Sequence, residues 1–246
     1  MTELNVLYED DYLLAIDKPS GLLVHPSPIE RRAENAVTLL REQRNFKAYT
    51  IHRLDRPTSG VLLFAKDPVT ARAMCEQFAE RGTEKTYLCV CRGYTEPAGV
   101  IDYPLKEELD KLADKFANAD QEAKEAISAY RTLGQVELEI PSGKFSTSRY
   151  SLVEVKPRTG RKHQIRRHMK HIFHPIVGDT RHGDGRHNTL FREHFDLQRL
   201  LLLATDLSFR HPHTGNLMTV SAAPGQWEQS LFAKLGWQQL ITTDDC

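Results

Sequence analysis

The 246-residue sequence lacks several features that would place it in a specialised class of protein. Its four cysteines are too few for a disulfide scaffold, and Cys89 and Cys91 are separated by one residue, which is not the spacing of a metal-binding pair. No apolar run approaches the roughly 20 residues of a membrane-spanning helix. The first twelve residues contain acids and lack the apolar core of a signal peptide. We therefore expect a cytoplasmic protein without a membrane segment.

Net charge is also absent, because 33 Lys and Arg residues balance 33 Asp and Glu residues. The charges are nevertheless segregated along the chain. Residues 149–186 contain ten Lys and Arg residues against three acids, whereas residues 102–125 contain eight acids against four lysines. A local basic surface can bind a polyanion even when the whole molecule is neutral.

The composition, with 40% hydrophobic and 27% charged residues, excludes a disordered chain. No repeat or linker divides the sequence, which favours one domain over residues 1–246. Short apolar runs bounded by turn residues predict more strands than helices, and hence an α+β fold with a mixed, mainly antiparallel sheet flanked by helices and loops. The predicted strands are residues 4–7, 12–16, 22–24, 61–65, 86–91, 200–204, 207–210 and 217–220.

Two helices have clear sequence signals. Asp67 and Pro68 predict the start of a helix that ends near Gly82, with Met74 and Phe78 facing inward. A second helix, over residues 162–174 and stopped by Pro175, has apolar residues at helical spacing that predict one buried stripe. The buried stripe comprises Ile165, Met169, Ile172 and Phe173, and the opposite, basic face comprises His163, Arg166, Arg167, Lys170 and His174.

Several residues could carry chemistry, and each also has an ordinary structural interpretation. Asp55 lies between Arg53 and Arg56, so it should stay ionised, either as a functional carboxylate or in a loop salt bridge. Tyr87 fits a buried sheet tyrosine equally well. The acidic stretch 107–120 fits a surface helix or an insertion.

Histidines at helical spacing, His163, His168, His171 and His174, could share a metal ion. Five Lys and Arg residues between positions 161 and 170 disfavour a divalent cation there. Contact with phosphate groups fits this basic helix better.

Four motifs together resemble the RluA family of RNA pseudouridine synthases: HRLDRPTSG at 52–60, KTY at 85–87, RTGRKHQIR at 158–166 and HPIVGD at 174–179. The resemblance extends over nearly the whole chain. It implies the pseudouridine synthase catalytic fold and an isomerisation that needs no cofactor and no metal. The chain leaves no room before Leu4 for a separate N-terminal RNA-binding module, so we expect none.

Residues 103–117 resemble a subgroup that isomerises uridine 65 in the T-stem of tRNA, after flipping the base. The resemblance therefore implies tRNA as the partner, with no obligate protein partner and a monomeric enzyme. Alternatives are a synthase acting on rRNA or on other tRNA sites, or a non-catalytic RNA-binding protein.

The resemblance also implies roles for individual residues. Asp55 is the expected catalytic carboxylate, and Arg166 is expected to pair with it. Tyr87 would stack on the flipped uracil and assist proton removal at C5. The residues expected to bind RNA are Arg53, which would fill the space left by the base, and Arg161, Lys162, Arg167 and Lys170, which would hold phosphates.

Overall fold

The structure is a computed structural model that describes residues 2–26, 32–107 and 122–240. The predicted surface helix or insertion at 107–120 lies outside the described residues, apart from Glu107.

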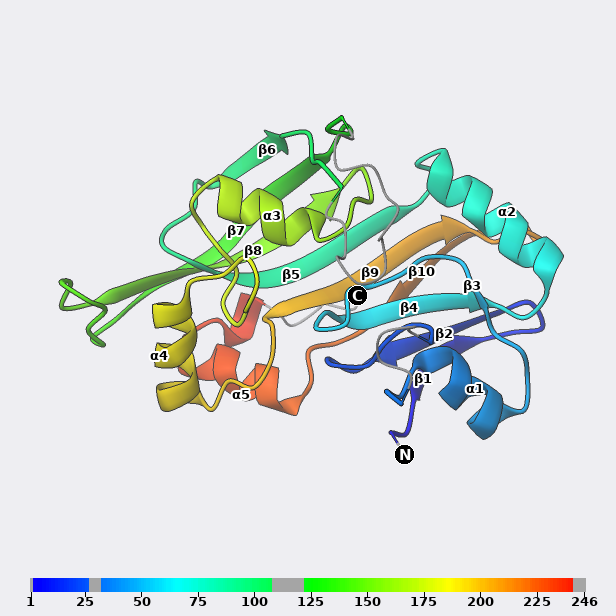
Figure 1. Ribbon diagram of the computed structural model, residues 1–246, viewed down its shortest axis with the longest axis horizontal. Helices are drawn as coiled ribbons and strands as arrows, with labels where there is room; N and C mark the ends of the chain where they lie inside the picture. The colour runs from blue at the N-terminus through cyan, green and yellow to red at the C-terminus, as the bar shows by residue number, and fades with distance from the viewer. Residues whose placement is uncertain (1, 27–31, 108–121, 241–246) are drawn as a thin grey trace.

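A mixed sheet forms the centre of the molecule, with the strand order β1-β2-β4-β9-β5-β8-β7-β6 (Figure 1). β3 and β10 pair with β4 and β9, respectively. Among the pairs of these strands only β4–β9 is parallel, so the predicted mainly antiparallel α+β architecture is confirmed. The strands are β1 Asn5–Glu9, β2 Leu13–Lys18, β3 Tyr49–Thr50, β4 Ser59–Ala65, β5 Glu84–Arg92, β6 Ala98–Asp102, β7 Ile127–Leu138, β8 Ser148–Pro157, β9 Leu202–Arg210 and β10 Leu217–Ser221.

Two of the strand predictions were wrong. The two strands predicted at 200–204 and 207–210 are one strand, β9, which begins at Leu202 and runs through the middle of the sheet. Residues 22–24 form no strand, because Leu23 makes only an isolated bridge to Asn35. The apolar side chains of Leu22 and Val24 are instead buried against α1 as part of a loop.

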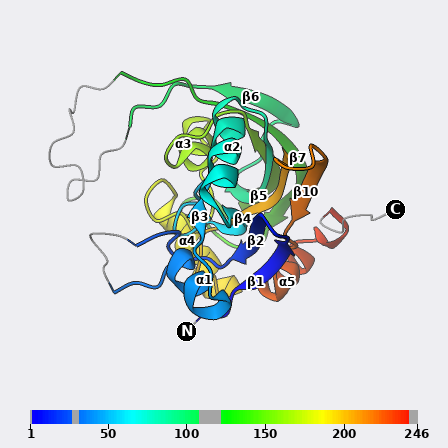
Figure 2. The ribbon, with the colours of Figure 1, turned by 90° about the vertical axis from the view of Figure 1, so that its right-hand side faces the viewer.

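Five α-helices cover the sheet in the described part of the chain: α1 Ala36–Arg44, α2 Pro68–Ala79, α3 Gln164–His171, α4 Gly185–Phe195 and α5 Gln226–Lys234. Along β5, Cys89 and Cys91 pack with α3, whereas Leu88 and Val90 pack with α4 and α5. Because successive residues of a strand point to opposite faces, these helices cover opposite sides of the sheet. Figure 2 shows the curvature of the sheet, with α2 toward the viewer and α3 to its left. None of the helices in the described ranges has the length and apolar character needed to span a bilayer.

The start of α2 was predicted correctly and its end was not. The Asp67 side chain accepts hydrogen bonds from the backbone N–H groups of Val69 and Thr70, and Met74 is fully buried. The helix ends at Ala79, three residues before Gly82. Arg81 adopts a left-handed conformation at φ 61°, which reverses the chain before the glycine is reached.

The basic helix, α3, is shorter than predicted, and two residues of the predicted helix differ from the prediction in their exposure to solvent. Ile165 and Met169 are buried as expected, but Phe173 is 79% exposed because the helix ends at His171. Arg166 does not lie on a solvated basic face, since its side chain is buried beneath the start of the helix.

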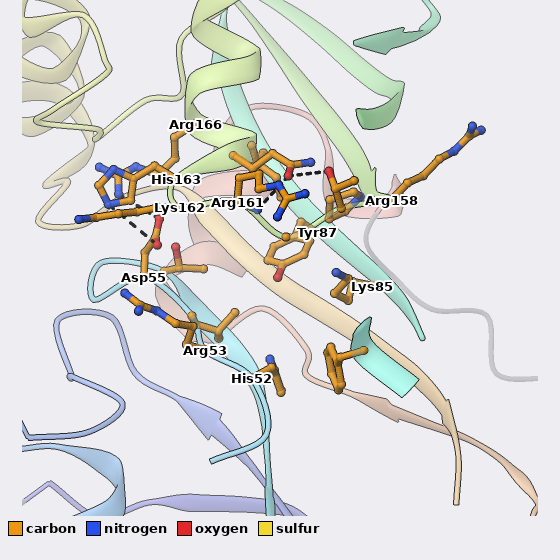
Figure 3. Close-up of a pocket in the computed structure, with 18 of the residues that line it drawn as sticks. His52, Arg53, Asp55, Lys85, Tyr87, Arg158, Arg161, Lys162, His163 and Arg166 are labelled. Carbon is orange, nitrogen blue, oxygen red and sulfur yellow. Dashed lines mark hydrogen bonds and ion pairs between the residues drawn. The ribbon is translucent and has the colours of Figure 1, made fainter. Parts of the chain in front are cut away.

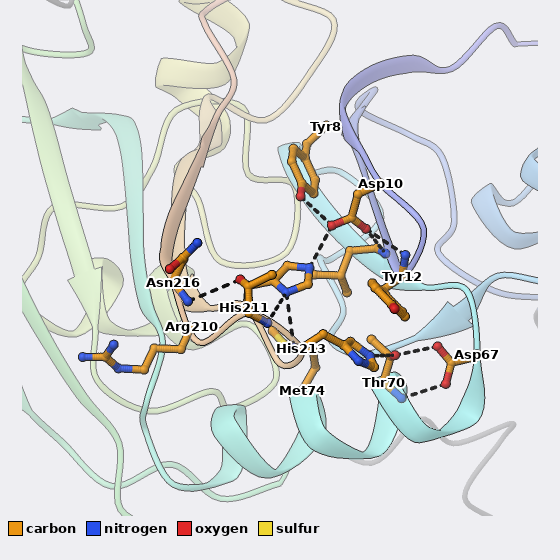
Figure 4. Close-up of polar contacts among 12 residues, drawn as sticks. Tyr8, Asp10, Tyr12, Asp67, Thr70, Met74, Arg210, His211, His213 and Asn216 are labelled. Carbon is orange, nitrogen blue, oxygen red and sulfur yellow. Dashed lines mark hydrogen bonds and ion pairs between the residues drawn. The ribbon is translucent and has the colours of Figure 1, made fainter.

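A polar cluster joins the first hairpin to the last one (Figure 4). The Asp10 carboxylate accepts a hydrogen bond from the Tyr8 hydroxyl at 2.6 Å and lies 2.8 Å from Nε2 of His211. His213 stacks on Tyr12, with 3.6 Å between ring centroids. Burial alone would raise the pKa of Asp10, but hydrogen bonds from Tyr8, the backbone and His211 lower it to about 2. The carboxylate therefore stays ionised at neutral pH.

The parallel contact between β4 and β9 depends on glycine. Gly60 has φ +107°, and a Cβ atom at this position would lie 2.1 Å from the carbonyl oxygen of Ala204. Gly21 has a similar φ of +88°, but nothing lies within 4 Å of its Cβ position.

We predict that Gly60→Ala lowers the free energy of unfolding by at least about 3 kcal/mol, because it adds a backbone clash to left-handed strain. Gly21→Ala carries only the strain and should cost about 1 kcal/mol. Urea denaturation of the two variants measures both effects. Equal losses in the two variants would contradict the close approach at Gly60.

Candidate active site

A cavity of about 620 Å³ opens where the loop before β4, the strand β5 and the start of α3 meet (Figure 3). Its lining is strongly cationic. Among the residues that the structure describes, two carboxylates, those of Asp55 and Glu107, line the cavity with seven Lys and Arg residues. The seven are Arg53, Arg81, Lys85, Arg158, Arg161, Lys162 and Arg166. Such a cavity attracts an anionic ligand.

The loop that carries Asp55 is held from behind by the turn at residues 18–21. Gly21 donates its N–H to the carbonyl oxygen of Arg56 at 2.9 Å, and the Ser20 hydroxyl donates to that of Pro57 at 2.7 Å. Lys18 is fully buried and donates to three carbonyl oxygens, including that of Arg56. Burial, followed by the charge of Arg199, lowers the pKa of Lys18 to about 7. These bonds fix the backbone beside Asp55.

A buried guanidinium group positions the Asp55 side chain. Nη1 of Arg166 donates to Oδ2 of Asp55 at 3.1 Å, while Nε and Nη2 donate to Asp179 at 2.7 and 2.9 Å. Asp179 is itself fixed by the backbone N–H groups of Arg181 and His182, each at 2.9 Å. Burial acts to lower the pKa of Arg166, but the bonds and charges of Asp179 and Asp55 raise it above the ordinary value. Arg166 therefore stays charged.

The Asp55 carboxylate is partly open to the cavity, since 20% of its side chain is exposed. Its Oδ1 atom lies 4.0 Å from Nε2 of His163, which begins α3 in a left-handed conformation. Nδ1 of His163 in turn lies 3.0 Å from Nε2 of His182. The imidazole of His163 and the guanidinium group of Arg166 thus lie beside the two oxygen atoms of the carboxylate, whose exposed part faces the cavity.

The opposite wall of the cavity comes from β5. Tyr87 lies between α3 and the Asp55 loop, and Lys85 lies below it on the same wall (Figure 3). Burial, and secondarily the charge of Asp55, raises the pKa of Tyr87 above its ordinary value, so the phenol is protonated at neutral pH. Burial lowers the pKa of Lys85.

His52 closes one end of this wall as a neutral ring. Its Nε2 atom accepts a hydrogen bond from the N–H of Leu63 at 3.0 Å, and the ring stacks on Phe78. Burial, with a contribution from Lys85, lowers the pKa of His52 to about 3.

Six of the eight residues predicted for the site line one cavity: Asp55, Tyr87, Arg166, Arg53, Arg161 and Lys162. Two lie elsewhere. Arg167 donates from Nη1 to the carbonyl oxygen of Lys106 at 2.8 Å, and Lys170 is exposed near the far end of α3. The sequence interpretation assigned no role to Lys18 or Asp179, although Asp179 ends one of the four motifs.

The helical histidines are separated by the fold. His168 is buried, within 3.0 Å of the Ser128 hydroxyl, and His171 stacks on Tyr103. His174 lies 2.9 Å from the carbonyl oxygen of Arg92. Within residues 2–26, 32–107 and 122–240, no three His, Cys, Asp or Glu side chains gather as a metal site would require.

Comparison with known proteins agrees with this geometry. A family model described as RNA pseudouridylate synthase matches residues 12–171. The chain belongs to the RNA pseudouridylate synthase family. As a member of this family, it is an isomerase that forms pseudouridine in RNA.

Relatives of this synthase match along nearly their whole length. The chain is 52% identical over 239 residues to tRNA pseudouridine synthase C of Vibrio cholerae, covering 97% of this chain and 98% of that protein. It is 51% identical to tRNA pseudouridine synthase C of Haemophilus ducreyi, covering 96% and 97%. The structure of Human RNA Pseudouridylate Synthase Domain Containing 1 matches with a TM-score of 0.72 at 23% identity, covering 99% and 97%, which supports the fold.

We predict that Asp179→Asn destabilises this synthase by about 3 kcal/mol at pH 7, because the buried Arg166 loses a charged partner. Burial acts to raise the pKa of Asp179, but the bonds and charge of Arg166 and the backbone N–H groups of His182 and Arg181 lower it. A carboxyl group with a lowered pKa in the folded state stabilises the fold at pH values above its unfolded pKa, which is near 3.9. That contribution is lost as pH falls through the lower folded pKa. The difference in unfolding free energy between wild type and variant should therefore shrink below about pH 4.

Urea denaturation across this pH range measures the effect, with Glu76→Gln as the control. Glu76 pairs with Arg72 at 3.0 Å, but both side chains are largely exposed, so its loss should leave stability unchanged within error. A pH-independent deficit in Asp179→Asn would contradict the assignment.

Proposed function

We propose that this chain isomerises a uridine in the T-stem of tRNA to pseudouridine, at uridine 65, and acts in the cytoplasm as a monomer. The observation that carries the proposal is a carboxylate fixed by a buried guanidinium group in a cationic cavity. The names of the relatives, tRNA pseudouridine synthase C, support tRNA as the substrate. The likeness of residues 103–117 to the T-stem-modifying subgroup supports the position.

The reaction breaks the bond between C1′ and N1 of the uridine and joins C1′ to C5. N1 gains a proton and C5 loses one, so substrate and product are isomers. Asp55 starts the reaction, either by attacking the nucleotide to form an ester or by removing a ribose proton to give a glycal. A carboxylate serves both routes, and the bond from Arg166 orients that of Asp55.

Tyr87 provides the surface on which the uracil is held while it turns. Its phenol is neutral because burial raises its pKa, so the ring stacks as an uncharged surface and the hydroxyl relays the C5 proton. Stacking is worth about 1 to 3 kcal/mol per base, similar to the cost of extruding a paired base.

The cations of the cavity bind the RNA backbone around the flipped nucleotide. Arg53, beside Asp55, enters the space that the base leaves. Arg161 and Lys162 lie at the rim and hold phosphates near the target. Arg167 and Lys170 lie further along α3 and hold more distant phosphates.

We predict that Asp55→Asn abolishes pseudouridine formation while the Kd for RNA stays within about tenfold, a difference of 1.4 kcal/mol. Asparagine keeps the shape of the side chain and removes its charge and nucleophile. Pseudouridine mapping of tRNA from a strain carrying only this variant should show loss of the modification at one T-stem position.

Product analysis with the wild-type protein separates this activity from others. The isomerase retains every base, whereas a sugar hydrolase releases free uracil. An active Asp55→Asn protein would refute the assignment of Asp55, and modification at rRNA or another tRNA position would refute that of the substrate.

We predict that Tyr87→Phe slows the single-turnover rate by about a hundredfold or more, because the ring still stacks and only the hydroxyl is lost. RNA affinity should stay near that of the wild type. Rapid-quench kinetics with tritium release from C5 would locate the slowed step. An unchanged rate would remove the proposed proton relay.

A further inference from the structure

The end of α3 has an unusual residue at its turning point. The N–H of Phe173 donates to the carbonyl oxygen of Lys170 at 3.0 Å, and the N–H of His174 donates to that of Met169 at 2.9 Å. This is the Schellman pattern, in which the left-handed position is most often glycine. Here Phe173 occupies that position at φ 66°. A bulky side chain there carries backbone strain that glycine avoids.

Packing does not compensate for this strain. Phe173 is 79% exposed, the largest exposed fraction of any large apolar side chain that the structure describes. The backbone beneath it is nevertheless held firmly. Nη2 of Arg92 donates to the carbonyl oxygen of Phe173 at 3.0 Å, and Nη1 of Arg92 bonds Asp184 at 2.5 Å. The ring is therefore presented to solvent from a fixed position.

Other rings and a cation lie beside Phe173. His171 and Tyr103 stack with 3.7 Å between centroids, and Tyr103 is 43% exposed. Lys170 is exposed, and no carboxylate of the described residues pairs with it. We call Lys170, His171, Phe173 and Tyr103 the α3 platform.

The α3 platform and the active site lie at the two ends of one helix. The first turn of α3 contributes Arg166 to the cavity, and Phe173 comes two positions after His171, the last residue of this eight-residue helix. Asp184 pairs with Arg92, the residue that also bonds the Phe173 carbonyl oxygen. Exposed rings beside a cation are the usual surface for stacking an unpaired nucleobase.

We propose that the α3 platform is a second contact for the substrate RNA, in which a nucleobase flanking the target stacks on Phe173 and Lys170 binds a neighbouring phosphate. The inference rests on the proposed function, because it takes the RNA in the cavity as the substrate. It accounts for a phenylalanine at a strained, exposed position where glycine would fold at least as well.

The decisive variant is Phe173→Gly, which removes the ring and relieves the left-handed strain together. We expect its stability in urea to equal or exceed that of the wild type. We expect its Kd for an unmodified tRNA transcript, measured in an Asp55→Asn background, to rise about fivefold or more. The effect should fall on KM rather than on kcat, since Phe173 is not among the residues that line the cavity with Asp55. Phe173→Trp should restore the affinity.

Leu217→Thr is the matched control, because Leu217 is 70% exposed on β10 and lies outside the platform. It should leave RNA affinity unchanged. Shortening the RNA stepwise on each side of the target should erase the difference between Phe173→Gly and wild type once the stacked nucleotide is removed.

Two results would overturn the proposal. One is unchanged RNA affinity in Phe173→Gly. The other is a change in the oligomeric state of Phe173→Gly by sedimentation, with RNA affinity intact, which would make the platform a protein interface. A wild-type protein that modifies other RNA but no tRNA would refute the proposed substrate instead, and the same variants would then be compared on the RNA that it modifies.

Discussion

The three-way contact between Arg166, Asp55 and Asp179 is the constraint on which the site depends. A guanidinium group buried this deeply is stable only with charged partners, and Asp179 supplies two of its bonds. The third bond reaches a residue 111 positions earlier in the chain. Arg166 therefore links α3 to the Asp55 loop across the sheet, and the orientation of the carboxylate is set by the same interaction that satisfies a buried charge.

The loop is equally constrained from its other side. Lys18 places its ammonium group among three backbone carbonyl oxygens, one of them from Arg56. The reacting carboxylate thus lies between two buried basic side chains. Arg166 holds the carboxylate itself, and Lys18 holds the backbone of the next residue, Arg56. Rigid support of this kind is what a catalytic group needs, because small displacements of a reacting atom are costly.

A local signal, the Asp67 cap, predicted the start of α2. The resemblance to a known family, and not local spacing, singled out Asp55, Tyr87 and Arg166, and the structure places these three residues at one cavity. The resemblance also gave the pairing of Arg166 with Asp55. The bonds from Arg166 to Asp179 and from Lys18 to Arg56 join residues 13 and 38 positions apart, which no spacing reveals. Phe173 was wrongly assigned to the core. The helix ends at His171 and Phe173 adopts a left-handed conformation, and helical periodicity in the sequence reveals neither feature.

The position of β9 in the sheet has a consequence for biosynthesis. Asp55 precedes β4 and Tyr87 belongs to β5, yet these strands are separated by β9, which is made of residues 202–210. A nascent chain that has emerged only as far as α3 contains every residue of the cavity except Leu202, but lacks the strand that sets the two halves side by side. The two strands beside the cavity can therefore take their places in the sheet only when β9 is present between them.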